Sequence, residues 1–147
     1  MTNFQTPESA TTTRQASAGF PPVEADPALQ LAYAIAAAAD ERKGGNITIL
    51  QVGDVSYLAD YFVVVTGFST VQVRAITRSI EGTLEDDFNR RPLRVEGQME
   101  GNWILMDYGE VIVHVFMPEA REFYDLEAFW GHANQMLYTP PSPKSNG

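Results

Sequence analysis

Two apolar runs separated by a glycine-containing turn fill residues 103–116, which read Trp103-Ile104-Leu105-Met106-Asp107-Tyr108-Gly109-Glu110-Val111-Ile112-Val113-His114-Val115-Phe116. Short runs rich in β-branched and aromatic residues on either side of such a turn are typical of a β-hairpin. Beyond it, Phe123, Leu126 and Trp130 recur at spacings of three and four residues, which predicts a helix packed behind the hairpin. A hairpin with a helix on one side has one face left open.

The two faces of this hairpin follow from a choice of loop. With Tyr108 and Gly109 as a two-residue loop, Trp103 lies opposite His114, and side chains alternate between faces along each strand. One face is then wholly aliphatic and is the expected core: Ile104, Met106, Val111, Val113 and Val115. The other, which we call the mixed face, carries Trp103, Leu105, Asp107, Glu110, Ile112, His114 and Phe116. This register sets Asp107 against Glu110, a like-charge pair that a wider loop would avoid.

The mixed face has the composition of a protein-binding surface, because aromatic residues are enriched at interfaces. We expect Trp103 to be the anchor residue of this surface, which a bound partner buries. The apolar residues expected to surround this anchor are Leu105, Ile112 and Phe116. The residues expected to give polar selectivity are Asp107, Glu110 and His114. Arg121, Tyr124 and Glu127 either extend this face or hold the last helix in place, whereas the spacing of Trp130 favours core packing.

A second helix over the mixed face is the alternative, and it would make His114 an ordinary hydrogen-bonded core residue. For His114 alone we favour this core interpretation. For the face as a whole we favour the interface.

Composition limits the classes of partner. The chain has 147 residues, no cysteine, ten basic and nineteen acidic residues, and a formal net charge of −9. Without cysteine there is no thiol catalysis, thiolate metal site or disulfide. An acidic chain is repelled by phosphate backbones, which disfavours direct nucleic-acid binding and favours a basic protein partner. No run approaches the roughly 18 apolar residues that span a bilayer, so we expect a soluble protein. Residues 1–26 lack the apolar centre of a secretory signal and the Arg-rich, acid-poor composition of a transit peptide, so we expect a cytoplasmic protein.

The order of elements predicts a single α/β domain over residues 27–138, with about five strands in one mixed α+β sheet flanked by helices. Asp26 and Pro27 open the first helix, and the run Tyr61–Val65 is apolar throughout, as in a strand buried on both faces. Ser69 and Gln72 form a capping box for the next helix. Residues 1–26 are rich in Thr, Ser, Ala and Pro and are expected to be a disordered tail. The proline-rich residues 139–147 cannot continue a helix and are expected to be a second tail.

Candidate chemical sites are weak, and we expect no catalytic residue, cofactor or metal. A phosphate at the helix start beside Ser69 would need a richer glycine loop and a lysine. The acidic run Glu85-Asp86-Asp87 points in several directions around a helix and is more typical of a solvated face. Asp54, Asp60 and Asp107 would form a carboxylate cluster only if their strand ends converge, and turn capping suits them better. His114 and His132 fit no nucleophile triad.

The chain resembles the ribosomal silencing factor family, RsfS, also called Iojap, over about residues 27–134. The resemblance is carried by runs in the family's order and spacing: 60–69 (DYFVVVTGFS), Glu96-Gly97, 103–109 (WILMDYG), 113–116 (VHVF) and 121–127 (REFYDLE) with Trp130. Phe68 stands where a small polar residue is expected, and the long N-terminal segment lies outside the pattern.

The resemblance implies a non-catalytic factor that binds the large ribosomal subunit through its ribosomal protein fourteen. On that intersubunit surface the factor would block joining of the small subunit and repress translation, with a further link to large-subunit maturation. It also implies a fold similar to nucleotidyltransferases but without their catalytic carboxylates, and a possible homodimer. Two other functions stay open from the residues: a metal-dependent nucleotidyl transfer enzyme using Ser69 with Asp54, Asp60 or Asp107, and a plain dimerisation module.

Overall fold

The computed structural model describes residues 19–54 and 56–141. Six strands form one sheet in the order β3-β4-β5-β2-β1-β6, in which β2 and β5 are parallel and all other neighbours antiparallel. The strands are β1 (Gly45–Gln51), β2 (Tyr61–Thr66), β3 (Arg94–Glu96), β4 (Trp103–Asp107), β5 (Val111–Phe116) and β6 (Asn134–Leu137). The helices are η1 (Val23–Ala25), α2 (Pro27–Glu41), α3 (Thr70–Phe88), α4 (Pro118–Tyr124) and α5 (Leu126–Phe129).

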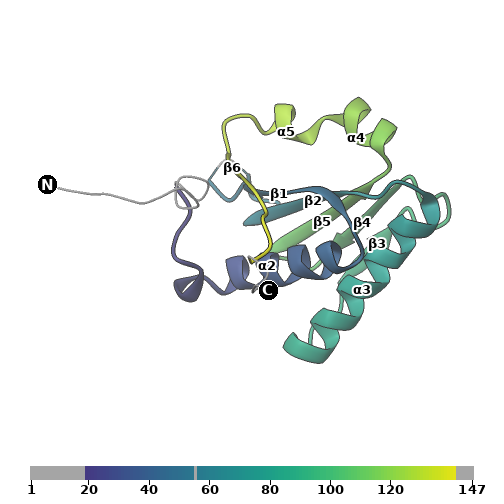
Figure 1. Ribbon diagram of the computed structural model, residues 1–147. Helices are drawn as coiled ribbons and strands as arrows, with labels where there is room; N and C mark the ends of the chain where they lie inside the picture. Colours follow the sequence, from purple (N-terminus) through teal and green to yellow (C-terminus); the bar gives the residue numbers. More distant parts are fainter. Residues whose placement is uncertain (1–18, 55, 142–147) are drawn as a thin grey trace, which may run out of the picture.

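Helices cover both faces of the sheet (Figure 1). The helices α2 and α3 lie on the aliphatic face of the β4–β5 hairpin, and α4 and α5 lie on the opposite, mixed face. The expected single α/β domain with a mixed sheet is confirmed. The sheet has six strands rather than about five, because β6 pairs with β1 at the far edge. Only Met136 of β6 is buried, so its sequence carries little strand signal.

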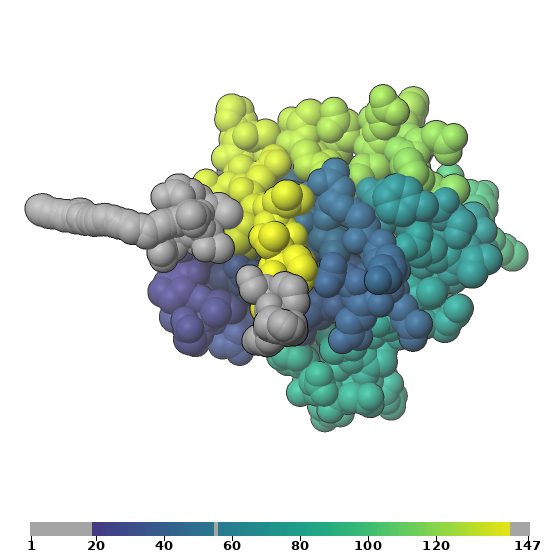
Figure 2. Space-filling view, in the orientation of Figure 1, coloured from purple at the N-terminus to yellow at the C-terminus, as the bar shows by residue number. Residues whose placement is uncertain are grey.

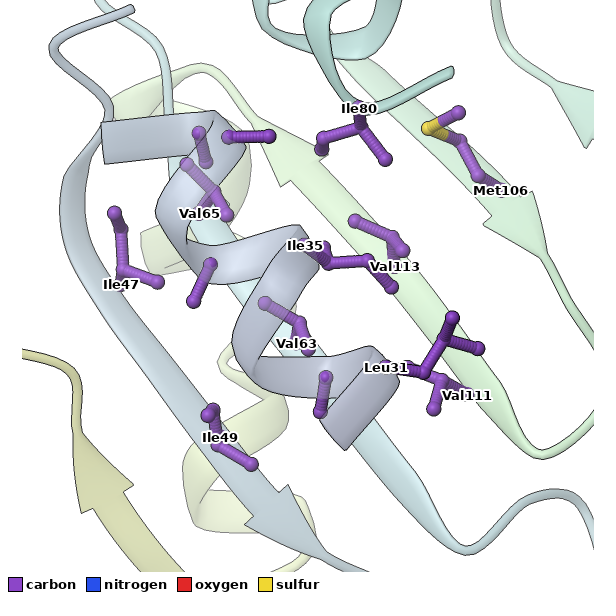
Figure 3. Packing of buried hydrophobic residues seen from close by; sticks show 14 of the residues in the cluster. Leu31, Ile35, Ile47, Ile49, Val63, Val65, Ile80, Met106, Val111 and Val113 are labelled. Carbon is purple, nitrogen blue, oxygen red and sulfur yellow. The ribbon is translucent and has the colours of Figure 1, made fainter. Parts of the chain in front are cut away.

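The main core lies between the sheet and the two longer helices. Asp26 caps α2 by accepting hydrogen bonds from the backbone N–H groups of Ala28 and Leu29, as its position before Pro27 predicts. Figure 3 shows Ile35 of α2 reaching to Val113 of β5. All five residues assigned to the aliphatic face are buried here: Ile104, Met106, Val111, Val113 and Val115.

Packing begins before residue 27. The ring of Phe20 stacks on that of Tyr61 with 6.0 Å between centroids, and the Tyr61 hydroxyl donates to Asp26 Oδ2 over 2.6 Å. Residues 19–26, assigned to the tail from composition, therefore contact the folded domain. The remaining tail assignments, 1–18 and 142–147, lie outside the described residues.

The predicted hairpin register is wrong by one loop position. Trp103 pairs with Phe116, Leu105 with His114, and Asp107 with Ile112. The loop is therefore Gly109-Glu110, closed by a hydrogen bond from the Tyr108 N–H to the Val111 carbonyl over 2.9 Å. Gly109 takes the positive φ of +94° that a tight hairpin loop requires at its first position, whereas the predicted loop would place Tyr108 there. The shift separates Asp107 from Glu110 and leaves every side chain on its predicted face.

The single helix expected behind the hairpin is also wrong in two respects. It is split into α4 and α5 at Asp125, which has a left-handed backbone with φ of 47° and ends α4. In addition, both pieces lie on the mixed face, since the longer helices α2 and α3 already fill the aliphatic one. Phe123, which was expected on the buried side of that helix, lies on α4 and is 79% exposed.

Candidate protein-binding face

The mixed face has a covered half and an open half. Over β5, β2 and β1 it forms a second, smaller core, in which Ile112 and Phe116 join Phe62 beneath Leu126 and Trp130. Trp130 packs edge-on against Phe62 with 5.5 Å between ring centroids, which confirms the expected core packing of Trp130. Over β4, Trp103 and Leu105 remain partly exposed, and α4 meets Trp103 through Tyr124 at its C-terminal end. The space-filling view shows the α4–α5 segment in light green forming one side of the molecule (Figure 2).

Trp103 is the centre of an aromatic cluster. Its ring lies 4.5 Å from that of Tyr124 and 4.9 Å from that of Phe116, measured between centroids. Tyr124 is 47% exposed and meets Phe123 edge-on at 5.0 Å. We call Trp103, Leu105, Phe123 and Tyr124 the aromatic patch. Aromatic side chains that are already immobilised by their neighbours lose little conformational entropy when a partner covers them, which suits an interface.

His114 belongs to the floor beneath this patch and not to its surface. It is 5% exposed, and its Nδ1 accepts a hydrogen bond from Trp103 Nε1 over 3.2 Å. Its Nε2 is buried and has no hydrogen-bond partner among residues 19–54 and 56–141. Burial lowers the pKa of His114 to about 4, because the charged imidazolium would lose its hydration. His114 is therefore a neutral core residue, as expected for this residue taken alone.

The two hairpin carboxylates are engaged within the chain. The Glu110 carboxylate accepts hydrogen bonds from both terminal guanidinium nitrogens of Arg90, Nη2 at 2.8 Å and Nη1 at 2.9 Å. This pairing holds the pKa of Glu110 below its usual range. Asp107 accepts the Gly109 N–H over 2.8 Å and lies 3.4 Å from Nε of Arg94. Glu110 thus fastens the hairpin turn to the segment after α3, while Asp107 stays at the rim of the aromatic patch.

Arg121 is a buried cation that ties α4 to the sheet. It is 7% exposed and donates to the hydroxyls of Thr66 on β2 and Thr48 on β1, over 2.9 and 3.2 Å. Its charge is balanced by Glu127 of α5, which accepts from Nε and Nη2. Such burial removes Arg121 from the surface that a partner can touch.

Of the nine residues proposed from sequence, the structure brings three to the open surface: Trp103, Leu105 and Tyr124. Ile112, His114 and Phe116 form the floor beneath them, and Asp107 lies at the rim. Glu110 and Arg121 hold the chain together. Sequence reasoning missed Phe123 and Arg94. Phe123 was assigned to a buried helix stripe, and Arg94 becomes relevant only through its cross-strand pairing with Asp107.

The residues considered for nucleotidyl transfer do not all meet in one site. Asp54 and Asp60 line a pocket of about 280 Å³ with Asp26, but Asp107 is not part of it. Ser69 follows the other end of β2 from Asp60, and it caps α3 by accepting from the Gln72 N–H over 3.0 Å. Within residues 19–54 and 56–141, no group of three or more His, Asp or Glu side chains could hold a metal ion. In the same ranges no helix is both long and apolar enough to cross a membrane.

Comparison with known proteins identifies the family. Residues 25–146 match the family model described as "Ribosomal silencing factor during starvation", RsfS. The chain is 39% identical over 98 residues to the ribosomal silencing factor RsfS of Bacillus subtilis, covering 67% of this chain and 82% of that protein. It is 38% identical over 124 residues to the chloroplastic protein Iojap of Zea mays, covering 80% of this chain but only 53% of the maize protein.

Solved structures agree with the fold. A crystal structure of a Chromobacterium violaceum protein superimposes with a TM-score of 0.67 at 30% identity, covering 79% of this chain and 92% of that one. Another, from Bacillus halodurans, gives a TM-score of 0.60 at 33% identity over 69% of this chain and 91% of that one. From the extent of the sequence match and the shared fold together, the chain belongs to the ribosomal silencing factor (RsfS) family.

Proposed function

We propose that this chain binds the large ribosomal subunit in the cytoplasm through ribosomal protein fourteen, and that it represses translation by keeping the small subunit from joining. Family membership supports the first part, since the relatives are named ribosomal silencing factors. A mouse relative, 30% identical over 87 residues, is named for mitochondrial assembly of the large ribosomal subunit, which supports a large-subunit target and a further role in its assembly.

The aromatic patch is the observation that carries this proposal. A partly exposed tryptophan, flanked by Tyr124 and Leu105 and fixed from below by Phe116, has the structure of an interface hot spot. It lies where the C-terminal end of α4 meets β4, and Trp103 and Leu105 stay partly exposed there. A partner that covers it would bury apolar area against a rigid floor.

The charge of the chain supports a basic partner. A net charge of −9 favours encounter with basic protein surfaces and disfavours a complex held by phosphate contacts. Ribosomal proteins are commonly basic, so a protein contact on the large subunit fits this charge better than an RNA contact. Once bound at the subunit interface, a folded domain excludes the small subunit by volume alone and needs no chemical step.

Co-sedimentation with isolated large subunits tests the proposal. Trp103→Ala and Tyr124→Ala are expected to weaken binding, the former by more than ~2 kcal/mol, or about 30-fold in Kd. Tyr124 is the cleaner position, because its exposure leaves the folded state little affected. Leu137→Ala serves as the matched control, since this exposed apolar residue lies on β6 at the opposite edge of the sheet. It should bind as the wild type does.

A second measurement tests the block itself. Small subunits are added to large subunits preloaded with the protein, and formation of seventy-S particles is followed by sucrose-gradient sedimentation. We expect joining to fail with the wild type and the Leu137→Ala control, and to recover with Trp103→Ala. A folded wild type that does not sediment with large subunits would overturn the proposal, as would one that binds and still permits joining.

A further inference from the structure

We propose that Arg121 is the positioning residue of the aromatic patch: by fastening α4 to β1 and β2, it sets Tyr124 against Trp103. The inference concerns how the patch is built, and only its binding readout rests on the proposed function. Arg121 and Tyr124 are both on α4, three positions apart in sequence, and are therefore neighbours on the helix surface.

The two side chains contact adjacent positions of one row across the sheet. Thr66 on β2 is the direct partner of Phe116 on β5, and Phe116 is the direct partner of Trp103 on β4. Arg121 bonds to Thr66 at one end of this row, and Tyr124 packs on Phe116 and Trp103 at the other. Neighbouring strands are about 4.8 Å apart, so a shift of α4 large enough to break the Thr66 bond also displaces Tyr124.

The helix itself has little means of holding this position. It has seven residues, its N-cap residue Met117 makes no side-chain capping hydrogen bond, and the chain turns at Asp125 directly after it. Helices this short are not stable by their own hydrogen bonds, so tertiary contacts decide where they lie. Ala120 and Leu126 supply apolar contacts to the second core, but such contacts are non-directional. The hydrogen bonds of Arg121 supply the direction.

An arginine suits this task better than any other residue. Its planar guanidinium reaches Thr48, Thr66 and Glu127 at once from three nitrogens, whereas a lysine presents all of its donors from a single nitrogen. The surroundings also make the position strict. A buried guanidinium must keep its partners, because leaving a buried charge unpaired is costly. Arg121 therefore allows few alternative placements of α4.

Tryptophan fluorescence tests the inference without any partner. The chain has two tryptophans, and Trp130→Phe leaves Trp103 as the only one. In that background we expect Arg121→Met to increase acrylamide quenching of Trp103 about as much as Tyr124→Ala does. With Tyr124→Ala already present, Arg121→Met should add nothing, because the two residues act through the same contact. Unchanged quenching in a folded Arg121→Met variant would overturn the inference, and so would fully additive effects.

Milder variants keep the test valid if Arg121→Met fails to fold. Thr66→Val removes one acceptor of the guanidinium and keeps the side-chain volume close to that of threonine, and it should raise quenching in the same direction by a smaller amount. Ile80→Val is the control for lost stability alone, since Ile80 is buried on the opposite face of the sheet. If Ile80→Val raises quenching as much as Thr66→Val, positioning by Arg121 is refuted.

Large-subunit binding gives the second readout. At a temperature where all variants are folded, Arg121→Met is expected to raise Kd at least fivefold relative to Ile80→Val. If the wild type does not bind at all, the proposed function fails while the quenching result still decides the inference. If the wild type binds and Arg121→Met binds equally well, the inference fails while the proposed function stands.

Discussion

The indole nitrogen of Trp103 donates a hydrogen bond to Nδ1 of His114, with 3.2 Å between the two nitrogens. The bond runs diagonally across the hairpin, because the direct cross-strand partner of His114 is Leu105. Since Nδ1 is the acceptor, the neutral imidazole carries its proton on Nε2. Trp103, the centre of the aromatic patch, is thus held by the buried imidazole of His114, which must stay uncharged to accept this hydrogen bond.

Acid should destabilise the protein through His114. Burial lowers the pKa of this residue in the folded state to about 4 from an ordinary value of 6.5, so the unfolded chain binds the proton more tightly. The stabilising contribution is complete above pH 6.5 and is lost as the pH falls toward 4. Between pH 7 and pH 5, the free energy of unfolding should fall by about 2 kcal/mol from this group, as measured by urea denaturation.

The variant His114→Gln isolates this contribution. Glutamine does not titrate and can still accept the Trp103 N–H, so its stability should depend less on pH in this interval. Subtracting the unfolding free energy of His114→Gln from that of the wild type at pH 7 and at pH 5 removes the effect of all other titratable groups. Parallel pH profiles for wild type and His114→Gln would show that His114 titrates at its ordinary pKa and is not buried as described.

Glu110→Gln should lower stability without changing partner affinity. The substitution removes the negative charge that pairs with both guanidinium nitrogens of Arg90, and about 1 kcal/mol of unfolding free energy should be lost because the pair is only partly exposed. Glu85→Gln is the control: its pair with Arg91 is well exposed, and we expect almost no change. If Glu110→Gln instead weakens large-subunit binding at unchanged stability, the carboxylate contacts the partner directly.

The division of the hairpin into faces could be predicted because it depends only on alternation. The register could not, yet the error of one loop position changed each pairing by two residues and therefore kept every face correct. A positive φ at Gly109 and a hydrogen bond from Tyr108 decide the loop, and both are properties of three-dimensional geometry. The sequence indicated a loop containing Gly109, and the like-charge pairing of Asp107 with Glu110 was its one signal that the assumed loop was wrong.

Which helices cover the mixed face could not be predicted, because this depends on how all the helices are shared between the two faces of the sheet. The apolar residues Leu126 and Trp130 indicated a packed helix correctly, but their spacing does not say which side of the sheet it covers. The break at Asp125 and the buried pairing of Arg121 with two threonines come from contacts between residues far apart in sequence. These contacts reduce a face of seven candidate residues to a smaller exposed patch.

Glycine substitutions test the turn between β3 and β4, which contains Gly97. Gly97 has a φ of +88°, and a Cβ there would lie 2.0 Å from the Trp103 carbonyl oxygen. Gly97→Ala should therefore cost at least ~2 kcal/mol, through both backbone strain and displacement of Trp103. Gly82→Ala is the matched control, since Gly82 lies within α3 and, in the described part of the chain, an added Cβ there has no atom within 4 Å beyond the neighbouring backbone of its own helix. This variant should gain up to ~1 kcal/mol of unfolding free energy. Thermal unfolding should show a lower stability for Gly97→Ala and a higher stability for Gly82→Ala, each relative to the wild type. A Gly97→Ala variant as stable as the wild type would contradict the turn described.

Arg94→Gln should tighten binding to a basic partner. The Arg94 guanidinium lies 3.4 Å from Asp107 and 3.2 Å from Glu96, so one exposed arginine occupies both carboxylates beside the aromatic patch. A partner's cation must displace it, and replacing it with a neutral residue removes this competition. We expect about a threefold lower Kd at low salt, with the gain shrinking as ionic strength rises. Arg91→Gln makes the same change in net charge away from Asp107, so the excess gain of Arg94→Gln over Arg91→Gln measures the local effect; no excess, or weaker binding, would show that Asp107 does not meet a cation in the complex.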